Sequence, residues 1–334
     1  MSIPRFVDAP PPGSSSRHQR FGSACAAASL LLLGWACSHA PEGGATTTGA
    51  GIGGGTAAAG GAPTGTSAGG SAGTGGAGGA AGGSPAGSSL VDTGLIVRYY
   101  IDEAASGQGP AELVDAAPAP QPLGMVWGPE LSYAEDGAGH RGLRWNQIEQ
   151  YSRATVAVDG TKISGQLHGS TTGTIETVVS VSAVSTSHSR LSHIGQDEEG
   201  GRFTLSMPSP SRLQFYTASG RKGYWEVDFP GLGRIVLHLV LDTTLADPAE
   251  RVKLYLDGAL VPSVGGEPPD QDEVLDLGTG RHYVLGNREV GERTFVGTLY
   301  YAAMYGSALS AADVLNNVGV LISDDDTPDD TPAR

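Results

Sequence analysis

One segment of the 334-residue chain cannot contribute to any folded core, and it limits where a domain can begin. From Gly43 to Ser89 the sequence has no charged and no aromatic residue, and it consists almost entirely of Gly, Ala, Ser and Thr. Such a composition behaves as a flexible coil with a root-mean-square reach of roughly 40 Å. A collagen helix is excluded, because the consecutive glycines at 53–55 break its three-residue period. We therefore predict a disordered linker over residues 41–89.

The N-terminal region carries the features of a secretory signal peptide in their usual order. Arg17 and Arg20 precede an apolar stretch from Ala24 to Cys37 that includes four consecutive leucines. A membrane-spanning helix needs roughly 20 apolar residues, whereas this stretch is shorter and is followed at once by polar residues. We therefore predict an export signal over residues 1–40 rather than a permanent transmembrane anchor.

The end of the apolar stretch bears on how the signal is processed. Residues 33–37, Leu-Gly-Trp-Ala-Cys, resemble a bacterial lipobox, in which the cysteine receives lipid and becomes the mature N-terminus. Ordinary signal cleavage after Ala40 is the alternative, but Pro41 would then directly follow the scissile bond. The resemblance implies lipidation at Cys37 and an outer-membrane or cell-surface location, with secretion as the alternative. The chain would contact a membrane only through this N-terminal lipid.

The cysteine content limits the chemistry of the folded part. The chain has two cysteines, Cys25 and Cys37, and both lie in the export region. Disulfides, zinc–thiolate sites, cysteine nucleophiles and redox pairs are therefore excluded from the rest of the chain. A domain without such crosslinks has to be held together by burial, which the length of residues 90–322 allows.

The charge balance argues against nucleic acid as a partner. Residues 41–334 hold 17 of the 20 basic and 34 of the 35 acidic residues, which gives a net charge of −17. Such a chain repels nucleic acid and anionic membrane surfaces. Part of the excess lies in an Asp-rich run at the C-terminus, and we predict an acidic disordered tail over residues 323–334.

Residues 90–322 show the pattern of an all-β domain. Short runs rich in β-branched and aromatic residues are separated by Gly, Pro, Asn and Asp. This pattern predicts strands at residues 94–101, 174–181 and 234–242. The last of these has apolar residues at both odd and even positions, so we expect both of its faces to be covered.

Two local signals are stronger than the rest. The alternating residues 252–256 are followed by Asp257-Gly258 and then by apolar residues, which predicts a β-hairpin with a two-residue turn. Ser310 with Asp313 three residues later predicts the N-terminus of a short terminal helix. This is the one helix that we expect.

Several motifs in the last third of the chain resemble laminin-G-like or concanavalin A-like jelly rolls of bacterial surface lipoproteins. They are the strand and turn at residues 252–258, the strand at 283–287, and the closing strand and helix start at 295–299 and 304–310. The resemblance implies an all-β fold, a two-sheet antiparallel jelly-roll sandwich over residues 90–322 with one short C-terminal helix.

The resemblance does not extend to a metal site. The family usually has acidic residues, often calcium ligands, after a Gly-x-hydrophobic triplet, and here those positions hold Tyr300 and Tyr301. We therefore expect no cofactor, and a structural calcium ion has no support. The eight histidines form no metal-binding motif, and His188 and His193 lie in a Ser-rich stretch that we expect to be a loop.

One stretch is similar to part of a retaining-glucanase motif, Glu-x-Asp-x-x-Glu, whose third acid donates a proton to the leaving sugar. Glu226 and Asp228 match the first two acids, but the third position is Gly231. Because retaining glycosidases need two catalytic carboxylates, the missing acid argues against an enzyme. We expect Glu226 and Asp228 to face solvent, in alternation with buried apolar residues.

Ligand binding is the function that remains. Trp127 and Tyr133 lie in an irregular stretch where an aromatic ring can serve as a sugar platform. Arg288 and Arg293, in a loop between two expected strands, can bind a carboxylate or hydroxyl group. We predict an exported, non-catalytic protein that uses these four residues to bind a glycan or a protein at the cell surface. The alternatives are a purely structural display protein and a degenerate glycoside hydrolase.

Overall fold

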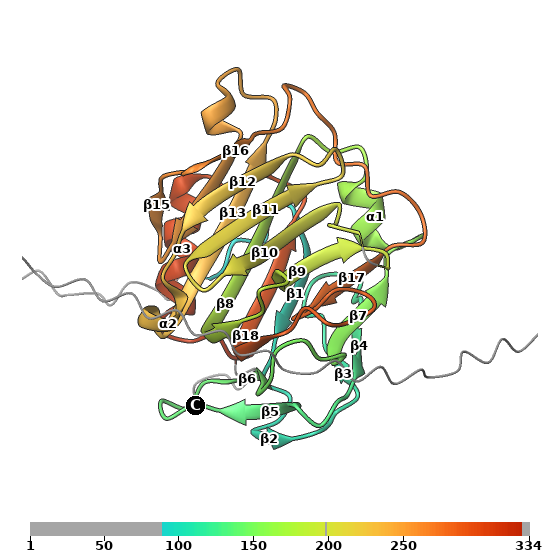
Figure 1. The fold of residues 1–334 in the computed structure, drawn as a ribbon, viewed down its shortest axis with the longest axis vertical. Coiled ribbons are helices and arrows are strands. Elements are labelled where there is room, and N and C mark those ends of the chain that lie inside the picture. The colour runs from blue at the N-terminus through green and yellow to red at the C-terminus, as the bar shows by residue number, and fades with distance from the viewer. Residues whose placement is uncertain (1–88, 198, 329–334) are drawn as a thin grey trace, which may run out of the picture. The chain divides into compact units, whose positions relative to one another are not determined.

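The computed structural model describes residues 89–197 and 199–328, and in this part of the chain two antiparallel sheets face each other (Figure 1). In spatial order, the first sheet contains β15 (Ala259–Val261), β14 (Val252–Leu256), β13 (Arg234–Asp242), β8 (Thr172–Val184), β18 (Phe295–Tyr305), β6 (Arg141–Trp145), β5 (Leu131–Glu135) and β2 (Ser106–Gly107), with β1 (Leu95–Tyr100) paired to β18. The second contains β16 (Gly265–Glu267), β12 (Lys222–Glu226), β11 (Arg212–Thr217), β10 (Phe203–Ser209), β9 (Ser189–Gly195), β17 (His282–Leu285), β7 (Arg153–Ala157), β4 (Leu123–Val126) and β3 (Glu112–Leu113). The predicted two-sheet antiparallel sandwich is confirmed.

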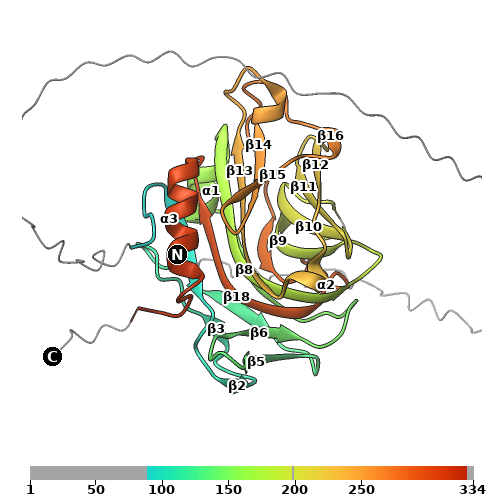
Figure 2. The ribbon, with the colours of Figure 1, turned by 90° about the vertical axis from the view of Figure 1, so that its left-hand side faces the viewer.

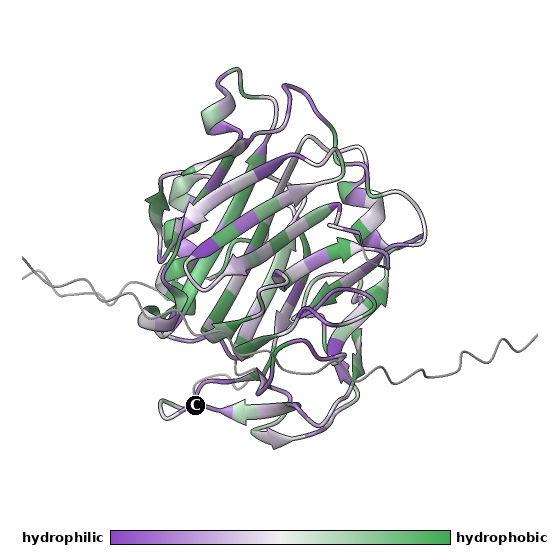
Figure 3. Cartoon of the chain, in the orientation of Figure 1, coloured by the Kyte–Doolittle hydropathy of each residue, from purple (hydrophilic) through white to green (hydrophobic). Residues whose placement is uncertain are grey.

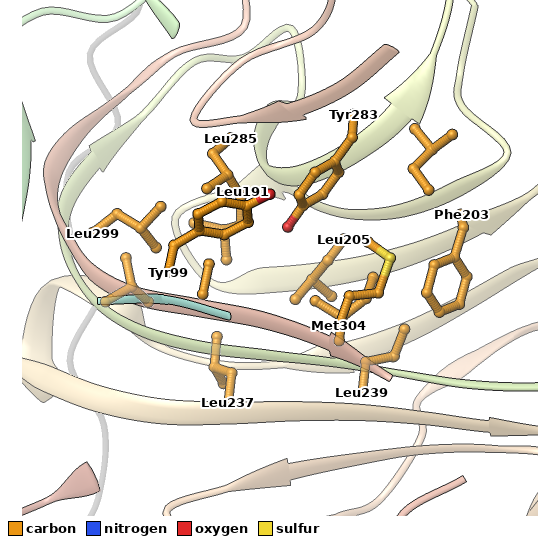
Figure 4. Packing of buried hydrophobic residues seen from close by; sticks show 14 of the residues in the cluster. Tyr99, Leu191, Phe203, Leu205, Leu237, Leu239, Tyr283, Leu285, Leu299 and Met304 are labelled. Carbon is orange, nitrogen blue, oxygen red and sulfur yellow. The ribbon is translucent and has the colours of Figure 1, made fainter. Parts of the chain in front are cut away.

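The inner faces of the two sheets form the main hydrophobic core. Figure 4 shows Leu237, Leu239 and Met304 of the first sheet opposite Phe203 and Leu205 of the second. Because side chains alternate along a strand, each strand gives every second residue to this layer and turns the others outward. The sandwich therefore leaves one outer face on each sheet, and the two faces are covered differently.

The outer face of the first sheet is covered by α3 (Ala311–Leu321), which packs on it as Figure 2 shows. Val236 and Val240 of β13 join Val314 and Val318 of α3 in a second apolar cluster. The odd-numbered apolar residues of β13 point into the main core. Both faces of β13 are thus buried, as its sequence predicts.

A buried polar network lies beneath α3. Glu176 of β8 is fully buried, and its carboxylate forms a 2.6 Å hydrogen bond with His238 Nε2 of β13. It also accepts hydrogen bonds from the hydroxyls of Tyr301 (3.0 Å) and Tyr305 (2.8 Å) and from Asn317 Nδ2 of α3 (2.8 Å). This carboxylate therefore joins three strands of the sheet and the helix.

The two strong local predictions are confirmed. β14 and β15 form the expected hairpin, and Asp257 (φ 48°) and Gly258 (φ 82°) both have the positive φ that a type I′ turn requires. α3 begins with a capping box, in which Ser310 accepts from the backbone N–H of Asp313 and the Asp313 side chain accepts from the backbone N–H of Ser310.

Four details differ from the prediction. β18 is one continuous strand over residues 295–305, and two helices were missed, α1 (Lys162–Leu167) and the single turn α2 (Phe229–Leu232), besides the 3-10 turn Pro248–Glu250. α1 has no side-chain cap and is held by burial of its apolar residues, which sequence pattern alone does not reveal. The Ser-rich stretch that contains His193 is strand β9 rather than a loop, because its pairing with β10 and β17 outweighs the low strand propensity of serine.

The predicted disordered tail over residues 323–334 is wrong for the part that the structure describes. Asp325 is buried, and its carboxylate lies 2.7 Å from Arg234 Nη2 and 2.8 Å from His140 Nδ1. Thr327 donates its backbone N–H to Asp102. The ion pair with Arg234 and the hydrogen bond with His140, rather than solvation, decide where Asp325 lies. Residues 329–334 lie outside the described residues.

Residues 1–88 also lie outside the described residues, so the export signal, lipidation at Cys37 and the linker remain predictions. Within the described residues, no helix has the length and apolar character needed to cross a membrane.

Candidate ligand-binding site

The outer face of the second sheet carries polar side chains where the first sheet carries an apolar patch. On β10, Thr204 lies opposite His193 of β9 on one side and Tyr216 of β11 on the other. The next outward position, Ser206, lies opposite Arg190 and Gln214 in the same way. We call the outward residues of β9–β12 the polar face: Arg190, His193, Thr204, Ser206, Arg212, Gln214, Tyr216, Lys222, Tyr224 and Glu226. Figure 3 shows hydrophilic bands crossing these strands on the side turned to the viewer.

Arg190 is the most unusual residue of the polar face. It is 6% exposed, and its Nε has no hydrogen-bond partner. Among the described residues, no carboxylate forms an ion pair with its guanidinium. Its burial, and then the positive charges of Arg293 and Arg288, lower the pKa of Arg190 to about 10. It stays protonated at neutral pH, and the described part of the chain provides no counter-ion for this buried cation.

Arg288 and Arg293 come from the loop between β17 and β18. Arg288 is 4% exposed, and its guanidinium donates to the carbonyl of Gly291 (2.8 Å) and to the Glu292 carboxylate (3.0 Å). Arg293 is half-buried and donates through Nη1 to the carbonyl of Ser187. Its own carbonyl accepts from the backbone N–H of Arg190 at 2.8 Å, which fixes the loop against β9. We call Arg190, Arg288 and Arg293 the arginine cluster.

His193, the neighbour of the arginine cluster on β9, is covered by the turn at Gly201. A side chain at Gly201, which has φ 117°, would collide with Thr204 and His193, so the backbone closes directly over the imidazole. The ring forms a 3.0 Å hydrogen bond with Thr204 Oγ1 through Nδ1, while Nε2 has no partner. Burial, and then the charges of Arg190 and Arg288, hold the pKa of His193 well below its usual value. His193 is therefore neutral at pH 7 and adds no charge to the cluster.

Two tyrosines give the polar face an aromatic surface. Tyr216 and Tyr224 are half-buried, so that part of each ring is accessible. Lys222 Nζ lies 5.2 Å from the centre of the Tyr216 ring, and the Arg212 guanidinium lies 5.6 Å from the centre of the Tyr224 ring. Rings held next to hydrogen-bond donors offer both stacking and polar contacts. Sequence reasoning missed them, although polar residues alternate with apolar ones along residues 212–217.

The sequence of the sandwich agrees with its architecture. Residues 154–315 match the family model of the concanavalin A-like lectin/glucanases superfamily. The sandwich therefore resembles this superfamily, and we call residues 90–322 the concanavalin A-like domain. The resemblance noted from the strand and turn motifs is thereby confirmed for the fold. A search among curated protein sequences gives no match.

Solved structures similar to the concanavalin A-like domain include three with different partners. Trypanosoma rangeli sialidase in complex with sialic acid shares 13% identity at a TM-score of 0.45, over 70% of this chain and 34% of the sialidase. The second is domain 4 of AbnA, a GH43 extracellular arabinanase from Geobacillus stearothermophilus, in complex with arabinotriose. It shares 17% identity at a TM-score of 0.46, over 68% of this chain and 100% of the arabinanase domain. The receptor-binding domain of botulinum neurotoxin C/D mosaic serotype shares 12% identity at a TM-score of 0.46, over 69% of this chain and 52% of the neurotoxin chain. The match thus spans about a third of the sialidase chain.

The four residues predicted to bind a ligand form two pairs in the concanavalin A-like domain. Trp127 is half-buried after β4, with its ring centre 5.8 Å from that of Tyr133 on β5. Tyr133 is 1% exposed, which leaves almost none of its ring for a sugar. Arg288 and Arg293 lie together in the arginine cluster, where Arg288 is committed to its own loop. Ligand contact by these four residues stays a prediction.

In the glucanase-like stretch, residues 225–231, the strand ends before the position of the third acid. Glu226 is the last residue of β12, Asp228 precedes α2, and both are exposed, whereas the apolar residues between and beside them are buried. This alternation is as predicted. Gly231, at the position of the missing acid, lies in α2 rather than on the strand.

The two tyrosines at the family's usual acidic positions are buried on β18. Tyr300 is 4% exposed, and Tyr301 takes part in the Glu176 network. Within the residues that the structure describes, no group of three or more His, Cys, Asp or Glu residues is placed to hold a metal ion.

Proposed function

We propose that the protein is a non-catalytic binding protein whose concanavalin A-like domain holds a glycan on the polar face. The observation that carries this proposal is the polar face itself, where the half-buried rings of Tyr216 and Tyr224 lie on the same side of the sheet as the unpaired Nε of Arg190. A buried polar atom without a partner costs about 1–3 kcal/mol. A strand whose only task is packing gains stability when such a group is replaced by an apolar side chain.

The chemistry of the polar face suits a sugar. Tyr216 and Tyr224 offer rings on which the C–H face of a pyranose can stack, and Gln214 and Ser206 offer hydrogen-bonding groups between them. Glu226 is the one carboxylate that β9–β12 turn to the polar face, so these strands provide no pair of carboxylates at the 5–5.5 Å that a retaining glycosidase needs. Binding without hydrolysis is the function that this surface supports.

The proposal is tested by glycan-array binding of the full chain. We expect Tyr216→Ala to weaken binding about tenfold, because the stacking ring is lost, and Leu260→Ala, an exposed residue of β15, to leave it unchanged. The same glycans, with laminarin, lichenan and agarose, should release no reducing ends, with or without Glu226→Gln. Absence of binding to any glycan would favour the purely structural display protein, and hydrolysis lost in Glu226→Gln would favour an enzyme.

We also propose that the protein is exported and anchored at the bacterial surface through lipid on Cys37. The support is the lipobox-like sequence, the basic and apolar residues before it, and the linker-like composition of residues 43–89. Cys37→Ser is expected to abolish labelling by a radioactive fatty acid and to leave a larger precursor. Cys25→Ser should leave both the labelling and the size unchanged. Labelling that persists in Cys37→Ser would exclude the anchor at this residue.

A further inference from the structure

Within the arginine cluster, Arg190 has no ion-pair partner among the residues that the structure describes. Arg190 is buried, its Nε has no hydrogen-bond partner among the described residues, and the positive charges of Arg293 and Arg288 act on it. Buried arginines in proteins are paired, because a guanidinium stripped of water and left alone is costly. Arg190 therefore has the environment of a residue whose partner is a separate molecule.

The acidic residues near the cluster are already engaged. Glu292 binds Arg288 at 3.0 Å and accepts from the Tyr151 hydroxyl at 2.9 Å, and Glu149 accepts from the Ser185 hydroxyl at 2.7 Å. Glu149 and Glu292 line a hollow of about 270 Å³ with Ser187 and Arg293. An anion would be repelled from that hollow, so it has to approach Arg190 from the polar face.

On the polar face the surroundings of Arg190 favour an oxyanion. Ser206 lies directly across on β10, and Gln214 lies next to it on β11. Ser206 Oγ and Gln214 Nε2 make only long hydrogen bonds of 3.4 Å, to the Gln214 carbonyl and to the Tyr224 hydroxyl. Both groups can turn toward an incoming ligand, because the hydrogen bonds that they would give up are long and therefore weak. A planar guanidinium beside neutral donors matches a carboxylate or a sulfate, which accepts two parallel hydrogen bonds from the fork.

We propose that Arg190 binds the anionic group of an acidic polysaccharide, a carboxylate or a sulfate ester, on the polar face. This inference rests on the proposed glycan-binding function and adds the class of glycan. The chain as a whole carries a net charge of −15, which disfavours non-specific binding of a polyanion. We expect binding at Arg190 to weaken as salt screens the contact.

The test compares charged and neutral forms of the same polymers by isothermal titration calorimetry with the full chain. Polygalacturonate is set against its methyl ester for the carboxylate, and dextran sulfate against dextran for the sulfate. We expect the charged form of one pair to bind at least tenfold more tightly than its neutral form, and Arg190→Gln to remove that preference. Arg190→Lys, which keeps the charge without the fork, should restore only part of it. Arg141→Gln, an exposed arginine on β6 of the other sheet, is the matched control and should change nothing.

The outcomes separate the two proposals. Binding of neutral glycans alone, unchanged in Arg190→Gln, would overturn the anion site and leave the glycan-binding function in place. Charged polymers that bind wild type and Arg190→Gln equally would also overturn it. Absence of binding to any array glycan and to all four polymers would overturn both. Thermal melting of each variant shows whether a lost signal reflects unfolding.

Discussion

Glu176→Gln is expected to lower the free energy of unfolding by about 3 kcal/mol at pH 7, since it breaks a buried charge network. The Glu176 carboxylate accepts hydrogen bonds from two tyrosines and from Asn317, and it also bonds to His238. A glutamine would replace one of the two acceptor oxygens by an NH2 group, which cannot accept a hydrogen bond from these partners. Urea denaturation measures the change. Glu267→Gln, an exposed acid on β16, is the control and should change stability by less than about 0.5 kcal/mol.

The contribution of Glu176 to the free energy of unfolding is expected to depend on pH. Burial alone would raise the pKa of Glu176, but the charge of His238 and the hydrogen bonds from His238, Asn317 and Tyr305 hold the pKa below its usual value of 4.5. The folded state therefore binds this proton less readily than the unfolded state. The stabilisation is present above about pH 4.5 and is lost as the pH falls through the lower, folded pKa. A wild-type advantage that stays constant from pH 7 to pH 3 would contradict this account.

Arg190→Met is expected to act in the opposite direction and to raise the free energy of unfolding by about 2–3 kcal/mol. The pKa of Arg190 is lowered to about 10 from 12.5, so below pH 10 the folded state bears the full cost of keeping the buried guanidinium charged. Methionine keeps much of the apolar stem and removes the charge. The measurement is urea denaturation at pH 7 without ligand.

Arg212→Met, at an exposed position on β11, is the control for Arg190→Met and should leave stability unchanged within about 0.5 kcal/mol. A loss of stability in Arg190→Met would mean that favourable contacts hold the guanidinium in the free protein. A gain of stability together with a loss of anion binding is the pattern expected where a binding site is kept at the expense of stability.

The fold was predictable where local chemistry and burial agree. The apolar residues at both odd and even positions of β13, the Asp257-Gly258 turn and the capping box of α3 each specify their structure within a few residues. The prediction of a disordered tail was wrong because the position of these residues depends on partners far away in the sequence. Asp325 is held by Arg234 and His140, which are 91 and 185 residues away in the sequence. No local pattern indicates such a partner.

The candidate site was less predictable than the fold. Trp127 and Tyr133 were chosen by residue type, and burial of Tyr133 removes most of its surface. Arg288 and Arg293 do lie in the arginine cluster, but the residue that makes the cluster unusual, Arg190, stands in a serine-rich stretch with no strand signal. That Arg190 lacks an ion-pair partner among the described residues appears only when β9, β10 and the β17–β18 loop are brought together.

The chain enters the sandwich on the side away from the polar face. Val91 donates its backbone N–H to Asn317 Oδ1 at 2.8 Å, and Asn316 Nδ2 donates to the Ser89 carbonyl at 2.9 Å, so the described chain starts against α3. The helix covers the outer face of the first sheet, whereas the polar face belongs to the second (Figure 2). A surface or fusion partner joined directly at Ser89 would therefore face α3 and would leave the polar face accessible to a ligand.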